Sequence, residues 1–144
     1  MSDEGRVLLV DDETDFVEAL SARLEARGLK VDSASDGQTA LVKVKTKKFD
    51  TVILDMAMPG MDGLETLEGL LGINPDLQVI LLTGKATLEQ AATAIRIGAL
   101  DLLEKPADIG TLSEKIELAA TKRWSLEEKR IEEKVSDIMR KKGW

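Results

Sequence analysis

The chain has 144 residues, the length of one domain, and 43% of them are hydrophobic, which is enough to fill a core. It has no cysteine and no histidine, which excludes disulfides, thiol chemistry, typical zinc sites and histidine-based acid–base catalysis. Residues 1–120 carry 12 basic and 22 acidic residues, a net of −10, whereas residues 121–144 carry 8 basic and 5 acidic residues, a net of +3. The acidic body argues against general binding to nucleic acid.

The sequence has no signal that directs it to a membrane. No apolar stretch approaches the roughly 20 residues that span a bilayer. Residues 1–5 also lack the basic-then-apolar order of a signal peptide. We therefore expect a soluble cytoplasmic protein.

Short apolar runs bounded by turn residues alternate with helical patterns along the chain. The expected strands are 6–10, 30–34, 51–54, 78–82 and 100–104. The expected helices are 14–27, 37–47, 63–73, 87–97 and 109–122, the last with Asp108 as its N-cap. Five strand–helix repeats joined by right-handed crossovers give an α/β fold with a doubly wound, five-stranded parallel sheet. The strand order is not fixed by one sequence; the order 2-1-3-4-5 would place the first and third strands side by side.

Polar residues gather where the expected strands end. Asp11 and Asp12 follow the first strand, Asp55 follows the third, and Thr83 and Lys105 follow the fourth and fifth. Ligands of open α/β sheets bind at this carboxyl edge. Crowded carboxylates either protonate or recruit a cation, and oxygen ligands favour Mg²⁺, Ca²⁺ or Mn²⁺. A carboxylate can also attack phosphorus to give an acyl phosphate, whose charge a metal, a lysine and a hydroxyl would neutralise.

Each of these residues also has a purely structural interpretation. The acidic pair Asp11-Asp12 could cap the following helix, and Asp55 could be a solvated turn residue. Thr83 could be a simple cap, and Lys105 a surface lysine. Their occurrence together at successive strand ends favours a functional site over four unrelated structural roles.

At these positions the chain resembles the receiver domain of two-component response regulators, from Arg6 to about Thr121. The motifs that carry the resemblance are Asp11-Asp12, Asp55-Met56-Ala57-Met58-Pro59-Gly60-Met61-Asp62-Gly63, Thr83-Gly84 and Lys105-Pro106. The resemblance implies a flavodoxin-like (βα)5 fold with strand order 2-1-3-4-5 and a receiver domain over residues 1–121. It also implies a phosphorylation-controlled switch that catalyses only its own phosphorylation and dephosphorylation.

The resemblance assigns the acceptor and the metal ligands. Asp55 would accept a phosphoryl group from a sensor histidine kinase, a phosphotransfer protein or a small acyl phosphate. Asp12 would bind Mg²⁺ directly, with Mn²⁺ as an alternative, and Asp11 would bind it mainly through water. The backbone carbonyl of Ala57 would be a further ligand, alongside Asp55.

The resemblance also assigns the residues that respond to the phosphoryl group. Thr83 would hydrogen-bond it, Lys105 would pair first with Asp55 and then with it, and the bond from Lys105 to Pro106 would be cis. Leu102 stands where the family often has an aromatic residue, so smaller packing shifts would replace an aromatic relay. Lys85 and Ala57 flank the route of an attacking water, and Lys85 would either attract or shield the phosphoryl group.

Residues 122–144 lie beyond the resemblance and are too few for a usual DNA-binding output domain. Trp124, Ile131 and Ile138 are seven residues apart with Val135 beside them, which indicates a helix with one narrow apolar stripe. This C-terminal helical extension could fold back on the domain, pair with a partner or a second copy, or lie on a membrane surface. We expect no separate output domain, no direct contact with nucleic acid, no membrane contact, and either an unidentified downstream protein partner or a homodimer through the C-terminal helices.

Two other functions were weighed. A phosphatase of the haloacid dehalogenase type also forms an acyl phosphate, but normally has a second aspartate two residues after the nucleophile, where this chain has Ala57. A constitutive docking module would be expected to lose Asp55, the acidic pair or Lys105, and all of them are present.

Overall fold

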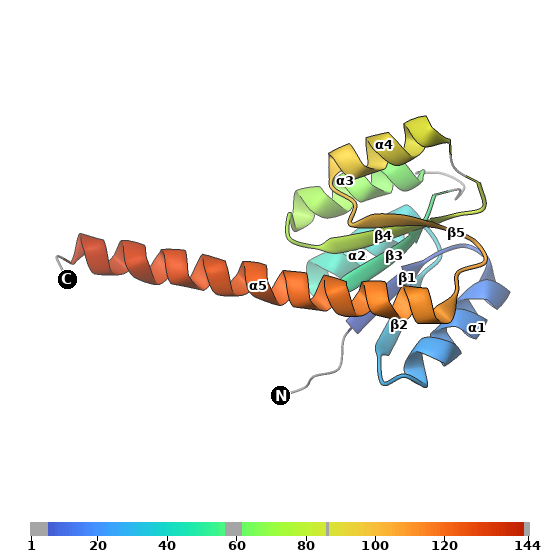
Figure 1. Cartoon of the computed structure of the whole chain (residues 1–144), viewed down its shortest axis with the longest axis horizontal. Coiled ribbons are helices and arrows are strands. Elements are labelled where there is room, and N and C mark those ends of the chain that lie inside the picture. Colours follow the sequence, from blue (N-terminus) through green and yellow to red (C-terminus); the bar gives the residue numbers. More distant parts are fainter. Residues whose placement is uncertain (1–5, 57–61, 86, 143–144) are drawn as a thin grey trace.

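The computed structural model of the chain describes residues 6–56, 62–85 and 87–142. The strands are β1 (Arg6–Val10), β2 (Lys30–Ala34), β3 (Thr51–Asp55), β4 (Gln78–Thr83) and β5 (Asp101–Glu104). The helices are α1 (Thr14–Glu25), α2 (Gly37–Thr46), α3 (Gly63–Ile73), α4 (Leu88–Ile97) and α5 (Ile109–Lys141). The five strands form one parallel sheet in the order β2-β1-β3-β4-β5, as the resemblance implied (Figure 1). The expected strands match the observed ones to within one residue at each end.

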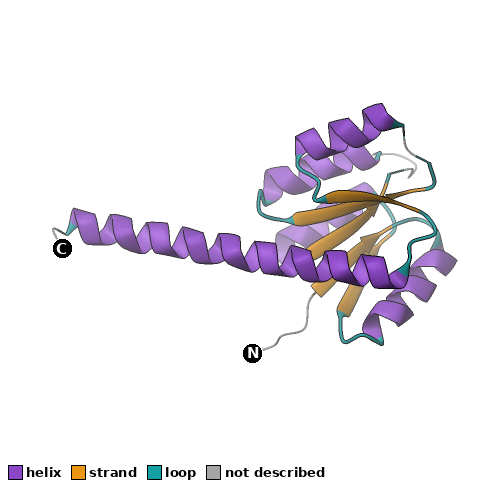
Figure 2. Cartoon of the chain, in the orientation of Figure 1, coloured by secondary structure: helices purple, strands orange, loops and turns teal. Residues whose placement is uncertain are grey.

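The sheet lies between two layers of helices (Figure 2). Side chains of successive strand residues point to opposite faces, so the apolar strands supply both layers at once. In β1, Leu8 and Val10 pack with α2, α3 and α4, whereas Val7 and Leu9 pack with α1 and α5. This burial on both faces explains why the strands are continuous runs of Val, Ile and Leu.

The strand register sets the position of the carboxyl edge. Val10 pairs with Leu54, so the residues that follow them, Asp11 and Asp55, leave the sheet side by side. On the other side of β3, Asp55 pairs with Leu82, one residue before Thr83. The order of the strands therefore places the acidic pair and Asp55 at neighbouring strand ends.

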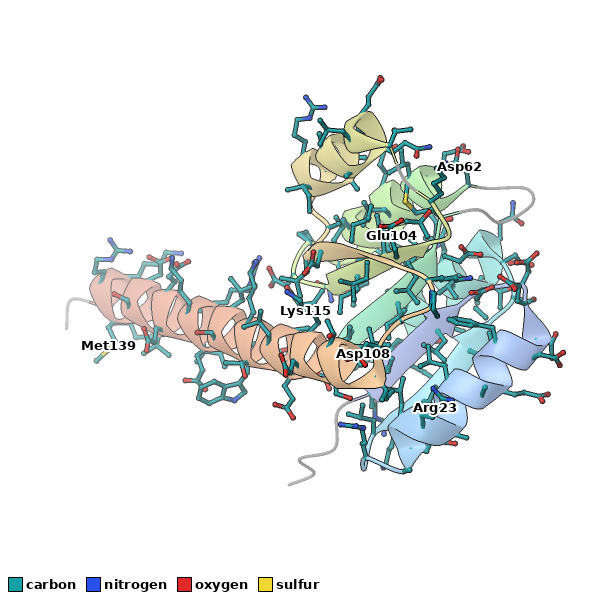
Figure 3. The ribbon with its side chains drawn as sticks, turned by 45° about the vertical axis from the view of Figure 1, so that its right-hand side comes forward. Arg23, Asp62, Glu104, Asp108, Lys115 and Met139 are labelled. Atoms are coloured by element: carbon teal, nitrogen blue, oxygen red, sulfur yellow. The ribbon has the colours of Figure 1, made fainter. Side chains whose placement is uncertain are left out.

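The helix α5 is a single continuous helix of 33 residues. Its N-cap is Asp108, whose carboxylate accepts a hydrogen bond from the Thr111 backbone N–H at 2.9 Å, as the sequence predicted. The predicted domain boundary after residue 121 falls inside this helix. The second half of α5 projects away from the sheet instead of folding back on it (Figure 1). In Figure 3, Lys115 lies on the first half of α5 and Met139 lies far along the projecting end.

Two arginines tie α5 to loops at the amino edge of the sheet, opposite the acidic pair. The guanidinium of Arg123, 7% exposed, donates to the carbonyl oxygen of Phe49 and lies 3.6 Å from Asp50 Oδ1. Two helical turns further along α5, Arg130 Nη2 donates to Asp76 Oδ1 at 2.8 Å. These contacts fix the direction in which α5 leaves the domain.

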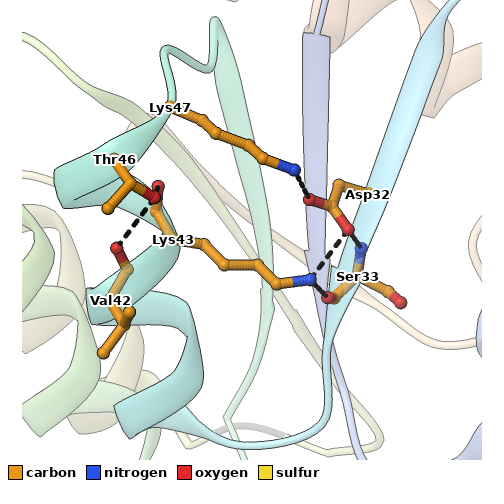
Figure 4. A network of polar contacts seen from close by, with 6 residues as sticks. All are labelled: Asp32, Ser33, Val42, Lys43, Thr46 and Lys47. Carbon is orange, nitrogen blue, oxygen red and sulfur yellow. Dashed lines mark hydrogen bonds and ion pairs between the residues drawn. The ribbon is translucent and has the colours of Figure 1, made fainter.

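A second polar cluster joins α2 to the edge strand β2 (Figure 4). Lys43 Nζ donates to Asp32 Oδ1 at 2.8 Å, and Lys47 Nζ donates to Asp32 Oδ2 at 3.0 Å. Burial by itself would raise the pKa of Asp32, but the bonds from Lys43, Lys47 and the Ser33 N–H outweigh it and lower this pKa from 3.8 to about 2. The carboxylate is thus charged throughout the neutral range.

Candidate functional site

Three carboxylates converge at the carboxyl ends of β1 and β3. Asp11, Asp12 and Asp55 offer oxygen atoms that all lie within 4.8 Å of one another. Asp11 and Asp55 are buried, whereas Asp12 is exposed. The Asp11 carboxylate is oriented by the Glu13 backbone N–H, which donates to Asp11 Oδ1 at 2.9 Å. An all-oxygen set at this separation fits a hard divalent cation such as Mg²⁺, which commonly keeps several of its waters.

Lys105 supplies the positive charge of the site. Its Nζ donates to Asp11 Oδ2 at 2.8 Å and to Glu13 Oε1 at 3.0 Å, and lies 3.7 Å from Asp55 Oδ1. The predicted partner Asp55 is therefore within ion-pair distance, but Asp11 is closer. The ammonium also lies 4.4 Å from the centre of the Phe16 ring, a cation–π contact.

The pKa of Lys105 reflects this arrangement. Partial burial by itself would lower it, but the hydrogen bonds to Asp11 and Glu13 and the charge of Asp55 raise it above its ordinary value. The lysine is therefore a permanent cation beside Asp55. A fixed cation in this place can neutralise charge that develops on an incoming group.

Thr83 and Lys85 lie at the end of β4, beside β5. Thr83 is buried, its hydroxyl oxygen accepts from the Lys85 backbone N–H at 3.2 Å, and its carbonyl accepts from the Lys105 backbone N–H at 2.7 Å. The backbone thus couples Thr83 directly to Lys105. The Lys85 side chain is exposed.

The remaining predicted positions divide into two groups. Leu102 in β5 is half-buried and packs against the core beneath α4, and the bond from Lys105 to Pro106 is cis, as predicted. Ala57, whose carbonyl was predicted to bind the metal, lies outside the described residues, as does the turn Met58-Pro59-Gly60.

Sequence reasoning missed two residues of the site. Glu13 shares Lys105 with Asp11, and Phe16 packs beneath the ammonium. Both follow the acidic pair closely, and the one available signal was their place in and before the first turn of α1. Nothing in their spacing indicated that they would reach Lys105, which is 92 residues after Glu13 in the sequence.

The fold and the acidic edge together define a flavodoxin-like α/β domain with three carboxylates that could hold a metal ion at the ends of β1 and β3. The family model of the response regulator receiver domain matches residues 7–117. The chain therefore belongs to the response regulator receiver family of two-component signalling systems. A receiver is a signalling module, and the curated relatives include a transcriptional regulatory protein and an acid tolerance regulatory protein.

Individual relatives agree with this assignment. The chain is 38% identical over 113 residues to the transcriptional regulatory protein ZraR of Salmonella typhimurium, a match that covers 78% of this chain and 26% of ZraR. It is 36% identical over 102 residues to the acid tolerance regulatory protein ActR of Rhizobium meliloti, covering 71% of this chain and 53% of ActR. The chain thus spans about a quarter to a half of the length of these relatives.

Solved structures share the fold. A CheY-like response regulator receiver domain protein from Methanospirillum hungatei superposes with a TM-score of 0.81 at 29% identity, covering 85% of this chain and 98% of that one. Among the described residues, no helix combines the length and apolarity needed to cross a bilayer.

Proposed function

We propose that Asp55 is the phospho-acceptor of this receiver and that its phosphorylation depends on Mg²⁺. The observation that carries the proposal is the convergence of Asp11, Asp12 and Asp55 within 4.8 Å, with the Lys105 ammonium 3.7 Å from Asp55. A buried carboxylate that lies beside both a fixed cation and a cluster of possible metal ligands is suited to attack phosphorus. Bound Mg²⁺ would neutralise phosphoryl oxygens and hold them in line with Asp55.

The chain's own residues supply the other functions. An Asp55 oxygen forms the new bond to phosphorus while the bond from phosphorus to the donor's leaving atom breaks. Lys105 then exchanges its contact with Asp11 for one with the phosphoryl group. The Thr83 hydroxyl hydrogen-bonds a phosphoryl oxygen, and the backbone bond from the Lys105 N–H to the Thr83 carbonyl holds the two residues at adjacent strand ends. Asp12 and Asp11 would hold the metal, the latter mainly through water, and the carbonyl of Ala57 would be a further ligand.

The donor would be a sensor histidine kinase, a phosphotransfer protein or a small acyl phosphate. A change at Thr83 would be passed to the loop after β4 and to α4, with Leu102 moving by small packing shifts because it has no ring to bury. Lys85, exposed beside the site, would set the lifetime of the phosphoryl group. The output would be an altered contact with a downstream protein or with a second copy.

Intact-mass spectrometry after incubation with acetyl phosphate tests this function. The chain should gain the mass of one phosphoryl group with Mg²⁺ present, and none with EDTA. Asp55→Asn should gain none under either condition, while its circular dichroism spectrum stays that of the parent chain. A folded parent protein that forms no Mg²⁺-dependent adduct would favour a constitutive docking module instead.

A further inference from the structure

The projecting half of α5 carries an apolar stripe that nothing in the described structure covers. Its members Trp124, Ile131, Val135 and Ile138 have exposed fractions of 65%, 59%, 48% and 44%. Large apolar side chains that are exposed in a row mark an interaction surface. The stripe begins directly after Arg123, and at about 100° per residue it lies on a different side of α5 from Arg123 and Arg130, the two arginines that tie the helix to the domain.

The stripe follows the alternating spacing of a coiled-coil seam. Trp124, Ile131 and Ile138 take one core position of successive heptads, and Glu128, Val135 and Lys142 take the other. At about 100° per residue, this seam lies about a third of a turn around the helix from the face that packs on the sheet. A second helix could therefore lie along the seam without displacing α5 from its own domain.

Charge decides the direction in which a second copy would fit. In a parallel pair, Glu128 would meet Glu128 of the second copy within the seam, and Lys142 would meet Lys142. Glu127, which lies beside the seam, would also face Glu132 of the second copy. Like charges in or beside a seam are destabilising, and those within it are poorly screened by salt.

An antiparallel pair reverses this pattern. Pairing Ile131 with Val135 of the second copy places Glu128 beside Ile138, and it brings Glu127 next to Lys141 of the second copy, twice over. Glu132 and Lys134 would each lie near their symmetry mates on the exposed flanks, one like-charge contact each, so the flanks roughly balance, and what the antiparallel pair avoids is the like charges within the seam.

In the same register Trp124 pairs with Lys142 of the second copy, so the seam between these two residues is covered over about 27 Å at 1.5 Å per residue. The two receiver bodies then lie at opposite ends of the pair. We propose that the projecting half of α5 binds a second copy of this chain as an antiparallel helical pair. This pairing goes beyond the phosphoryl chemistry of Asp55 and does not depend on it.

Disulfide trapping tests the direction of the pair, because the chain has no cysteine of its own. Two variants of the chain, Glu128→Cys and Ile138→Cys, are oxidised separately and as a mixture, without a phosphoryl donor. The antiparallel register predicts a covalent heterodimer in the mixture. It predicts no covalent homodimer of either variant alone, since each cysteine lies about 15 Å from the same cysteine of the second copy. Ser136→Cys, on the outer face of the helix, controls for random collision.

Light scattering of the unaltered chain completes the test. The account predicts a dimer that Ile131→Asp converts to a monomer with unchanged helix content by circular dichroism. Covalent homodimers of Glu128→Cys or Ile138→Cys would establish a parallel pair and overturn the proposal. A monomeric parent chain, or a dimer that survives Ile131→Asp, would overturn it as well. Phosphorylation of Asp55 is scored separately by mass, so the two proposals fail independently.

Discussion

The start of α3 leaves no room for a side chain, and this makes Gly63 a sharp test of how the site is built. A Cβ at Gly63 would lie 2.5 Å from the Cα of Met56 and 3.0 Å from its carbonyl oxygen. The Gly63 N–H donates to that same carbonyl at 3.2 Å. Because Met56 directly follows Asp55, the close approach holds the chain that leaves the acceptor. Space, and not an unusual backbone angle, is what requires glycine here.

Gly63→Ala should therefore destabilise the protein although alanine favours helices. The clash is with backbone, which yields less easily than a side chain, and overpacking of this kind costs about 2 kcal/mol. Gly72 in the same helix is the matched control, because nothing lies within 4 Å of a Cβ placed there. Gly72→Ala should gain about 0.5 kcal/mol from helix propensity alone.

Urea unfolding followed by far-ultraviolet circular dichroism measures both changes. With a slope of about 2 kcal/mol per molar urea, the midpoint of Gly63→Ala should fall by about 1 M and that of Gly72→Ala should rise slightly. The displaced Met56 should also slow phosphorylation of Asp55 in the first variant only. A Gly63→Ala midpoint equal to that of the parent chain would refute the reasoning, as would an equal loss in Gly72→Ala.

Three further predictions concern charged residues. Arg123→Met should lower the free energy of unfolding by about 2 kcal/mol, because it removes the donor to the Phe49 carbonyl. Arg130→Met should lower it less in the same urea titration, because the Arg130 side chain is exposed. Equal losses in the two variants would contradict this account. The folded-state pKa of Asp32 lies below its ordinary value, so its contribution is complete above pH 3.8 and is lost as the pH falls toward about 2. Asp32→Asn should therefore be less stable than the parent chain at neutral pH, by under about 1 kcal/mol because the pair is partly solvated, and the difference in urea midpoint should shrink across that window; a constant difference would contradict it. Lys105→Met should slow acetyl-phosphate labelling of Asp55 by at least about tenfold while Mg²⁺ binding persists in calorimetry; an unchanged labelling rate would argue against its role.

The sheet and the acidic edge were predictable from sequence because their signals are local. Runs of Val, Ile and Leu ended by a carboxylate mark a buried parallel strand, and Asp11 and Asp55 end two of them. The strand order came only from the resemblance, since no local pattern says which strands are neighbours. With that order confirmed, the register alone places Asp11 beside Asp55.

Other features depend on contacts that spacing does not encode. The nearest partner of Lys105 is Asp11 and not Asp55, and Glu13 joins them; a motif gives the members of a site but not their distances. The continuity of α5 was partly readable, because no proline follows residue 106. Arg123 occupies the buried face of that helix, seven residues after Ile116, where a charged residue reads as a break in the apolar pattern.

Peptide mapping after borohydride reduction tests the central proposal, phosphorylation of Asp55, most directly. Borohydride reduces an acyl phosphate to an alcohol, which converts a phosphorylated aspartate to homoserine and so marks the residue without any substitution. After acetyl phosphate and Mg²⁺, we predict homoserine at position 55 and unmodified aspartate at positions 11 and 12. Homoserine at position 11 or 12, or at none of the three in a folded protein, would contradict the account.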